Sequence, residues 1–184
     1  IAQECVKTIF LPTVRAMNAE GRTFKGCLYF GLMLTKNGPK VIEYNCRFGD
    51  PEAQVVLPLL NEDLFTIMRA VTDGTLNQTS VTFRNSHAVC VIMASQGYPQ
   101  SYATGFPISM DAQVKDNIFF AGVKSEDGIL KTAGGRVLGV TAVANTAEKA
   151  VQSAYEAVEH IHFENAFFRH DIGAKACAAY KKSE

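Results

Sequence analysis

One segment decides how this chain is interpreted: Val41-Ile42-Glu43-Tyr44-Asn45-Cys46-Arg47-Phe48-Gly49-Asp50-Pro51-Glu52. It begins with the apolar and aromatic pattern of a strand and ends in a loop dense in glycine, proline and charge. Alternate side chains of a strand share a face, so we expect Glu43 and Asn45 on one face, about 7 Å apart at a rise of ~3.3 Å per residue. Carboxylate and amide oxygens placed side by side are suited to a magnesium ion that is held mainly by substrate phosphates.

Arg47 follows Asn45 by two residues, and it joins the same face if the strand continues. A guanidinium group there would hold a transferring phosphoryl group or an acyl phosphate. The alternative is a polar strand end whose charges pair with one another. In the loop, Asp50 is suited to cap the next helix, Pro51 to its first position and Glu52 to its first turn. Capping needs no substrate and is compatible with a functional role.

Apolar periodicity and turn residues predict the elements on both sides of this segment. Residues 26–35 form a nearly continuous apolar run, which is typical of a strand buried on both faces. Asn37-Gly38 is a hairpin signal, so this strand pairs with residues 40–46. The helices expected in this half of the chain are 2–19 with a break at Pro12, 53–60, and 61–71 with Asn61 as its N-cap and Gly74 after its end.

A polar stretch over residues 75–85 separates a second unit of mixed α and β pattern. Its expected strands are 87–94, 118–123, a short one near Ile129, 137–144, and a strand with a turn within 163–173. Residues 147–161 have one apolar face and predict a helix that begins at an Asn145 or Thr146 cap. We therefore expect an α+β protein of largely antiparallel sheets backed by helices, divided into domains 1–76 and 77–184.

Composition excludes several classes of protein. The 18 basic and 18 acidic residues balance to a formal net charge of zero, so neither nucleic acid nor an anionic membrane is an expected partner. No apolar run approaches the ~20 residues that span a membrane. The five cysteines form no Cys-x-x-Cys pair, which argues against zinc, and their odd number argues for a reducing, cytoplasmic location. Because the chain lacks an initiator Met and opens inside an apparent helix, we expect it to be part of a longer protein.

The segment from Glu43 to Glu52, followed by Gln54, resembles the signature of the glycinamide ribonucleotide synthetase family. Further motifs of that family occur in the same order: Gly31-Leu32-Met33, Val56-Leu57-Pro58-Leu59-Leu60, Ser95-x-Gly97-Tyr98-Pro99, Gly134-Gly135-Arg136-Val137-Leu138 and Phe168-Arg169-His170-Asp171-Ile172-Gly173. The resemblance covers essentially all 184 residues. It is greatest to animal versions, in which this ligase is the first part of a multifunctional purine enzyme.

The resemblance implies the C-terminal part of an ATP-grasp fold followed by a small mixed α/β domain. In this family, ATP phosphorylates the glycine carboxylate, and 5-phosphoribosylamine then attacks the glycyl phosphate to give glycinamide ribonucleotide, ADP and phosphate. The implied cofactors are ATP and Mg²⁺ or Mn²⁺. The implied partners are these small molecules, the N-terminal and ATP-lid subdomains that lie upstream of residue 1, and further purine-pathway domains. The isolated chain is expected to be inactive.

Carried over residue by residue, the resemblance assigns metal binding to Glu43 and Asn45. It assigns to Arg47 the catalytic task of steadying the phosphoryl group and the acyl phosphate. The residues expected in the wall that faces the sugar phosphate are Gly49, Asp50 and Pro51. One departure is that residues 26–35 contain no acid, although many ATP-grasp enzymes place another metal ligand on this strand; Tyr29 stands near that position.

Other motifs carry two interpretations each. Gly134-Gly135-Arg136 is either a backbone anion nest with a substrate-binding Arg beside it or a loop whose glycines suit the backbone geometry. Arg169 and Asp171 are expected to form a structural ion pair at a turn. For the whole protein the rival interpretations are another ATP-grasp carboxylate–amine ligase with a different acceptor, and a non-catalytic assembly fragment.

Overall fold

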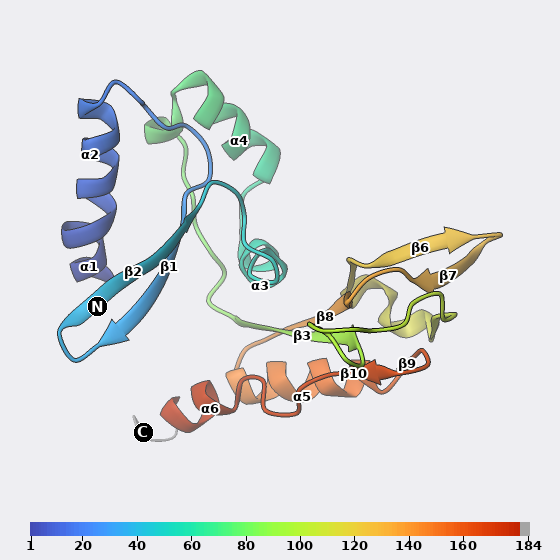
Figure 1. Ribbon diagram of the computed structural model, residues 1–184. Coiled ribbons are helices and arrows are strands. Elements are labelled where there is room, and N and C mark those ends of the chain that lie inside the picture. Colours follow the sequence, from blue (N-terminus) through green and yellow to red (C-terminus); the bar gives the residue numbers. More distant parts are fainter. Residues whose placement is uncertain (181–184) are drawn as a thin grey trace. The chain divides into compact units, whose positions relative to one another are not determined.

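The structure is a computed structural model that describes residues 1–180, and it consists of two compact units (Figure 1). The first unit contains residues 1–50 and 61–82, and the second contains residues 51–60 and the chain from residue 83 onward. The segment 51–60 therefore packs with the second unit, although it follows the first hairpin in sequence. These compact units do not test the predicted boundary between the family domains 1–76 and 77–184, which stays a prediction.

A broken helix opens the first unit. Its parts are α1 (Ala2–Cys5), a π-helical turn η1 (Val6–Phe10) and α2 (Leu11–Ala19). Pro12 has no N–H to donate, and the α-helical hydrogen-bond pattern is interrupted just before it, which confirms the predicted break. The helix ends where Gly21 adopts a φ of 71° and donates to the carbonyl of Asn18 at 3.0 Å.

The broken helix covers one face of a hairpin formed by β1 (Tyr29–Thr35) and β2 (Gly38–Asn45). The Phe30 ring lies 4.4 Å from that of Phe10 on the helix and 5.3 Å from that of Tyr44 on the partner strand. The prediction that the first strand is buried on both faces was wrong, because Leu34 is 61% exposed. Within residues 1–180, a helix packs on one side of this hairpin, so the apolar run retains exposed positions.

Helix α4 (Leu64–Asp73) completes the first unit together with a 3₁₀ turn, η3 (Leu76–Gln78). Its N-cap is Asp63 and not Asn61 as predicted: the Asp63 carboxylate accepts from the Thr66 N–H at 2.8 Å. This hydrogen bond lowers the pKa of Asp63 below its ordinary value. The predicted stop at Gly74 is confirmed by its left-handed φ of 75°.

A four-stranded antiparallel sheet in the order β10-β3-β8-β5 forms the second unit. Its strands are β3 (His87–Ser95), β5 (Ile118–Phe120), β8 (Arg136–Ala144) and β10 (Ala166–Phe167). Two small antiparallel pairs accompany it, β4 (Ser109–Met110) with β9 (Ile161–His162), and β6 (Val123–Glu126) with β7 (Ile129–Thr132). The unit also contains the 3₁₀ turn η4 (Ala112–Asn117) and helix α6 (Ala174–Tyr180). The strand predicted within 163–173 is thus only two residues long.

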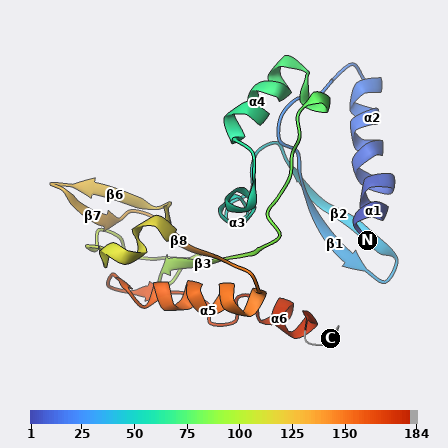
Figure 2. The same cartoon turned by 180° about the vertical axis from the view of Figure 1, so that it is seen from behind.

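Helix α5 (Ala147–Val158) runs along one face of this sheet, as Figures 1 and 2 both show. Ala150 and Ala154 are fully buried against the strands, where their small side chains permit a close approach. On the sheet, Met93 lies opposite Leu138, and both side chains are buried in the same core. Alternation therefore turns the neighbouring residues of β3 and β8 to the other face.

Part of the other face is covered by α3 (Ala53–Val56) and the 3₁₀ turn η2 (Leu57–Leu59). The hydroxyl of Thr141 on β8 donates to the Gln54 carbonyl at 3.1 Å and ties this short segment to the sheet. The single helix predicted over residues 53–60 is therefore a short α-helix and a 3₁₀ turn. Within residues 1–180, no helix has both the length and the apolarity needed to cross a bilayer.

The sequence offered Asn145 and Thr146 as candidates for the N-cap of α5. The structure shows that Thr146 is the cap, because its hydroxyl accepts from the Lys149 N–H at 3.2 Å. We expect Thr146→Ala to lower the free energy of unfolding by about 1 kcal/mol, the usual effect of losing such a cap. Urea unfolding checks this. The neighbouring Asn145→Ala is the control and should change stability by less than about 0.5 kcal/mol. Equal effects of the two substitutions would contradict the assignment of the cap.

Acid stability should depend on Glu126 at the end of β6. Its carboxylate lies 2.6 Å from Lys124 and 2.7 Å from Lys131, and hydrogen bonds to both lower its pKa from 4.5 to about 2. A lowered folded-state pKa stabilises the fold above about pH 4.5, and this contribution is lost as the pH falls toward 2. Glu126→Gln should therefore flatten the loss of stability in that window, measured by urea unfolding at several pH values. Exposed Glu164→Gln is the control and should leave the curve unchanged.

Candidate functional site

Glu43 and Asn45 lie side by side on β2, as the alternation predicts. The Asn45 side-chain amide donates to Glu43 Oε1 at 3.0 Å. Glu43 is exposed and Asn45 is half-buried, so the carboxylate is open to a ligand. Within residues 1–180 this is the only side-chain hydrogen bond of the pair, which leaves Glu43 Oε2 and Asn45 Oδ1 as oxygen ligands for a cation.

Gly31 makes room for the Glu43 side chain. The two residues are direct partners across the hairpin, next to a β-bulge between Gly31 and Leu32. A Cβ atom on Gly31 would lie 2.8 Å from Cγ of Glu43, which is closer than such atoms approach. Sequence reasoning did not assign Gly31 to the site. The available signal was a glycine inside an apolar strand, which marks a bulge or a close approach.

Arg47 does not lie on the strand. The strand β2 ends at Asn45, so the expected alternation does not extend to Arg47, and that conditional placement was wrong. Its Nη1 donates to the carbonyl of Phe48 at 2.8 Å, and its side chain is exposed. Within the described residues it forms no ion pair with Glu43, so the charges of this strand end do not neutralise one another.

The residues after Arg47 form a turn before the next helix. Gly49 is buried, and Asp50 is exposed. Helix α3 begins at Ala53 with Glu52 as the N-cap residue, and the Glu52 carbonyl accepts from the N–H groups of two following residues at 3.1 and 3.0 Å. The predictions that Asp50 caps this helix and that Pro51 is its first residue were therefore wrong by two positions.

The Gly134-Gly135-Arg136 segment is shaped by close packing. The Ser95 N–H donates to the Gly135 carbonyl at 2.8 Å, and its hydroxyl donates to the Gly134 carbonyl at 3.0 Å. A Cβ atom on Gly135 would lie 2.1 Å from the Tyr98 ring. Neither glycine adopts the left-handed φ that an anion nest uses, so the packing interpretation accounts for both. Their part in substrate binding stays a prediction.

A cavity of about 280 Å³ in the second unit brings two of the predicted site residues together, Pro51 and Arg136. It lies on the face of the sheet opposite α5, and its floor is the apolar side of β3 at Ile92 and Ala94. Arg169 also lines it. No local sequence signal connected Arg169 with Arg136, because the two residues are brought together only by the fold.

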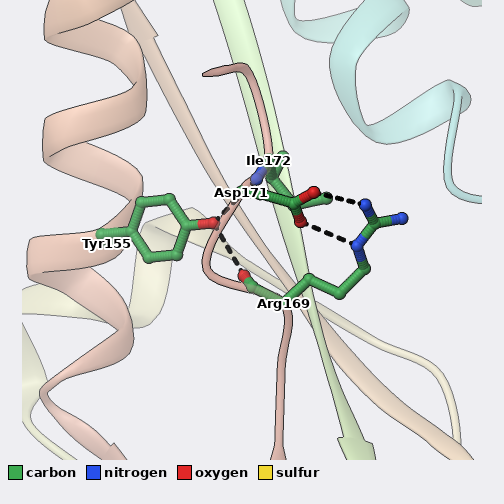
Figure 3. Close-up of polar contacts among 4 residues, drawn as sticks. All are labelled: Tyr155, Arg169, Asp171 and Ile172. Carbon is green, nitrogen blue, oxygen red and sulfur yellow. Dashed lines mark hydrogen bonds and ion pairs between the residues drawn. The ribbon is translucent and has the colours of Figure 1, made fainter. Parts of the chain in front are cut away.

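Arg169 and Asp171 form the expected ion pair, which Figure 3 shows. Arg169 Nε lies 2.8 Å from one carboxylate oxygen of Asp171, and Nη2 lies 2.6 Å from the other. These hydrogen bonds lower the pKa of Asp171 below its ordinary value. The Tyr155 hydroxyl on α5 donates to the Arg169 carbonyl at 2.7 Å and accepts from the Ile172 N–H at 3.1 Å, so it closes the turn.

The first unit contains a separate cavity of about 510 Å³ beside α4, and none of the residues that line it was predicted to bind a substrate. Its walls are mostly apolar. Lys25 donates to the Thr72 carbonyl at 3.3 Å at this cavity, and burial raises the pKa of the Cys27 thiol.

Two family models match the chain. The model for the phosphoribosylglycinamide synthetase ATP-grasp (A) domain matches residues 1–53, and that for the phosphoribosylglycinamide synthetase C domain matches residues 88–175. The chain belongs to the phosphoribosylglycinamide synthetase family. This confirms the resemblance found in the motifs. The two matches leave residues 54–87 unassigned, so they do not fix a domain boundary.

Curated relatives of the family cover nearly the whole chain. It is 45% identical over 172 residues to a phosphoribosylamine–glycine ligase of Caldanaerobacter subterraneus, which covers 93% of this chain and 41% of the relative. It is 44% identical over 181 residues to the trifunctional purine biosynthetic protein adenosine-3 of Gallus gallus, which covers 96% of this chain and 18% of that protein. The chain thus spans about two fifths of the single-function relative's length.

A solved member of the family has the same fold. The crystal structure of phosphoribosylamine–glycine ligase from Thermotoga maritima matches with a TM-score of 0.79 at 38% identity, over 91% of this chain and 42% of that one. The α+β fold class predicted from the sequence is confirmed. The first matched domain is an ATP-grasp domain, and this fold family uses ATP with a divalent metal.

The residues present fit a divalent metal held jointly with phosphates. Glu43 and Asn45 offer hard oxygen ligands on an open strand face. Within residues 1–180, no group of three or more His, Cys, Asp or Glu side chains is close enough to hold a metal. These two side chains would therefore supply few of the ligands and the substrate phosphates would supply others, which is the usual arrangement for magnesium.

The space above Gly31 provides a test of the local geometry. We expect Gly31→Ala to push the Glu43 side chain aside and break its hydrogen bond with Asn45, because the new Cβ would contact Glu43 Cγ. The side-chain amide resonances of Asn45 should shift in a ¹H–¹⁵N NMR spectrum. Met33→Ala on the same strand is the control, since Met33 is 54% exposed and distant from the pair in register. An unshifted Asn45 amide in Gly31→Ala would contradict this account.

Proposed function

We propose that the protein containing this chain catalyses the ATP-dependent ligation of glycine to 5-phosphoribosylamine. The products are glycinamide ribonucleotide, ADP and phosphate, and the reaction belongs to purine synthesis. The proposal is supported by membership of the family and by the adjacent carboxylate and amide of Glu43 and Asn45 on an open strand face. The reaction requires the whole protein, so we expect the isolated chain to be inactive.

The proposed reaction has two steps. The terminal phosphoryl group of ATP is transferred to a glycine carboxylate oxygen, and ADP leaves. The amine of 5-phosphoribosylamine then attacks the carbonyl carbon of the glycyl phosphate, loses a proton and displaces phosphate. Both steps concentrate negative charge on phosphoryl oxygens, so catalysis depends on positioning and electrostatic stabilisation.

In this proposal Glu43 and Asn45 hold a divalent cation, Mg²⁺ or Mn²⁺, that neutralises charge on the ATP phosphates. Arg47 steadies the transferring phosphoryl group and the acyl phosphate. Its hydrogen bond to the Phe48 carbonyl uses one guanidinium donor, and four of the five remain for phosphoryl oxygens. The side chain is exposed and can reorient when the substrate binds.

The proposed contacts to the phosphorylated sugar are the ones that the family resemblance assigns. In this proposal Arg136 binds directly, and Pro51 lines the same cavity. The remaining proposed wall residues are Gly49, Asp50, Gly134 and Gly135.

We also propose that the protein has upstream N-terminal and ATP-lid subdomains, and further purine-pathway domains as in the trifunctional relatives. We propose a cytoplasmic location, with which the five free cysteines are consistent.

The decisive experiment measures ADP release by the full-length protein with glycine and freshly prepared 5-phosphoribosylamine. We expect release only when both substrates are present. Glu43→Gln should lower kcat/KM by about 100-fold or more, as the loss of an electrostatic stabiliser does. Raising the Mg²⁺ concentration should restore part of this activity, because a weakened metal site fills at higher concentration. Exposed Glu20→Ala is the control and should behave like the unchanged protein.

The same experiment separates the rival functions. If ADP is released with a different acid and amine, the protein is another ATP-grasp carboxylate–amine ligase and the substrate proposal fails. If the full-length protein hydrolyses no ATP with any such pair, the chain is a non-catalytic module. If activity survives in Glu43→Gln without dependence on Mg²⁺ concentration, the assigned metal role is wrong.

A further inference from the structure

Tyr29 shares the face of the hairpin that carries Glu43 and Asn45. Residues directly opposite each other on antiparallel strands point to the same face, and Tyr29 is the direct partner of Asn45. Gly31 is likewise the direct partner of Glu43. The β-bulge comes after Gly31, so it leaves both pairs in register. The two proposed metal ligands on β2 therefore lie across the ladder from Tyr29 and Gly31 on β1.

The aromatic contacts of the next pair agree with this assignment of faces. Phe30 is the direct partner of Tyr44, and their ring centroids are 5.3 Å apart. The Phe30 ring also lies 4.4 Å from the ring of Phe10 on the broken helix. Phe30 therefore points toward the helix, and alternation along β1 turns Tyr29 away from the helix, to the face of the ligands.

Strand β1 treats the two ligands differently. Opposite Glu43 it leaves space, because a Cβ atom on Gly31 would lie 2.8 Å from Glu43 Cγ and 3.6 Å from its carboxylate carbon. Opposite Asn45 it provides an aromatic side chain, and the Cβ atoms of such a direct pair are about 4.5–5.5 Å apart. The burial of the ligands differs accordingly, since Glu43 is exposed whereas Asn45 and Tyr29 are both half-buried. Tyr29 is thus placed to limit movement of the Asn45 amide toward β1.

Asn45 is the ligand that depends most on such support. Its amide oxygen carries only a partial charge, so it attracts a cation less strongly than the Glu43 carboxylate does, and its direction matters more. The amide nitrogen donates to Glu43 Oε1 at 3.0 Å, which holds one side of the group. Asn45 is also the last residue of β2, and strand ends open more readily than strand centres. Tyr29 is the first residue of β1, so the pair closes this end of the ladder.

We infer that Tyr29 is a positioning residue for Asn45, whose amide its ring holds so that Oδ1 is directed to the cation. The inference rests on the proposed function for the metal role of Glu43 and Asn45. The metal site then extends across the ladder to β1, where Gly31 gives room to one ligand and Tyr29 supports the other. The ring acts in this role, and the phenol hydroxyl is not required.

The inference is tested by calorimetric titration of the full-length protein with ADP alone and with ADP and Mn²⁺ together. The ratio of the two affinities measures what the metal site contributes. Tyr29→Ala should lower this ratio about tenfold, as the loss of a group that orients a metal ligand does. Tyr29→Phe keeps the ring and should bind like the unchanged protein. Exposed Leu34→Ala, at the turn end of the same hairpin, is the control and should also leave the ratio unchanged.

The link to Asn45 is tested by combining substitutions. Asn45→Ala should lower the same ratio, and adding Tyr29→Ala to it should have no further effect, because the ring acts only through the amide that it positions. Additive effects would overturn the positioning role. So would an equal loss of affinity for ADP with and without Mn²⁺ in Tyr29→Ala, since that is the result of a general structural defect. Should Tyr29→Ala not fold, Tyr29→Val carries the test, because its branched side chain suits a strand but is too short to flank the amide.

Failures of the two proposals are distinguishable. If ligation proceeds and the ratio is the same in Tyr29→Ala as in the unchanged protein, the positioning role is wrong and the proposed function stands. If the ratio depends on Tyr29 and Asn45 but no ADP forms with glycine and 5-phosphoribosylamine, the positioning role stands and the proposed reaction fails. If Mn²⁺ does not tighten the binding of ADP to the unchanged protein, the metal role of Asn45 and the positioning role of Tyr29 are both wrong.

Discussion

The antiparallel pairing of β3 with β8 is the interaction on which the second unit depends. It places Met93 opposite Leu138 and Val91 opposite Val140, and these four side chains bury one face of the sheet under α5. The same pairing, with its irregularity between Met93 and Ala94, sends Ile92, Ala94 and Arg136 to the other face, where a short helical segment covers part of the surface. The core thus lies on one face of the β3–β8 pair, and the cavity lies on the other face.

Alternation has the same consequence in the hairpin of the first unit. One face carries Phe30 and Tyr44 and packs against the broken helix, while the other presents Glu43 and Asn45. A shift of register by one residue would exchange these faces, burying the carboxylate and exposing the rings. The bulge at Gly31 belongs to this register and gives the carboxylate its space.

Local signals in the sequence predicted local structure well. The alternation of Glu43 and Asn45, the stop at Gly74 and the helix after Thr146 each depend on neighbouring residues, and the structure confirms them. The start of α4 was predicted two residues too early, because Asn61 and Asp63 are both good N-caps. The end of β2 at Asn45 was also not predicted. Arg169 and Arg136 line one cavity because of the order of the strands in the sheet, and no local pattern of the sequence predicts that order.

The hairpin of β6 and β7 has a practical consequence. It projects from the second unit in both views, and its tip is formed by Asp127 and Gly128 at positive φ values of 51° and 77° (Figures 1 and 2). The tip contributes nothing to the buried core cluster. Exposed loop tips of this kind accept inserted segments. A fluorescent probe or an affinity peptide placed between these two residues would therefore report on the protein without disturbing either face of the sheet.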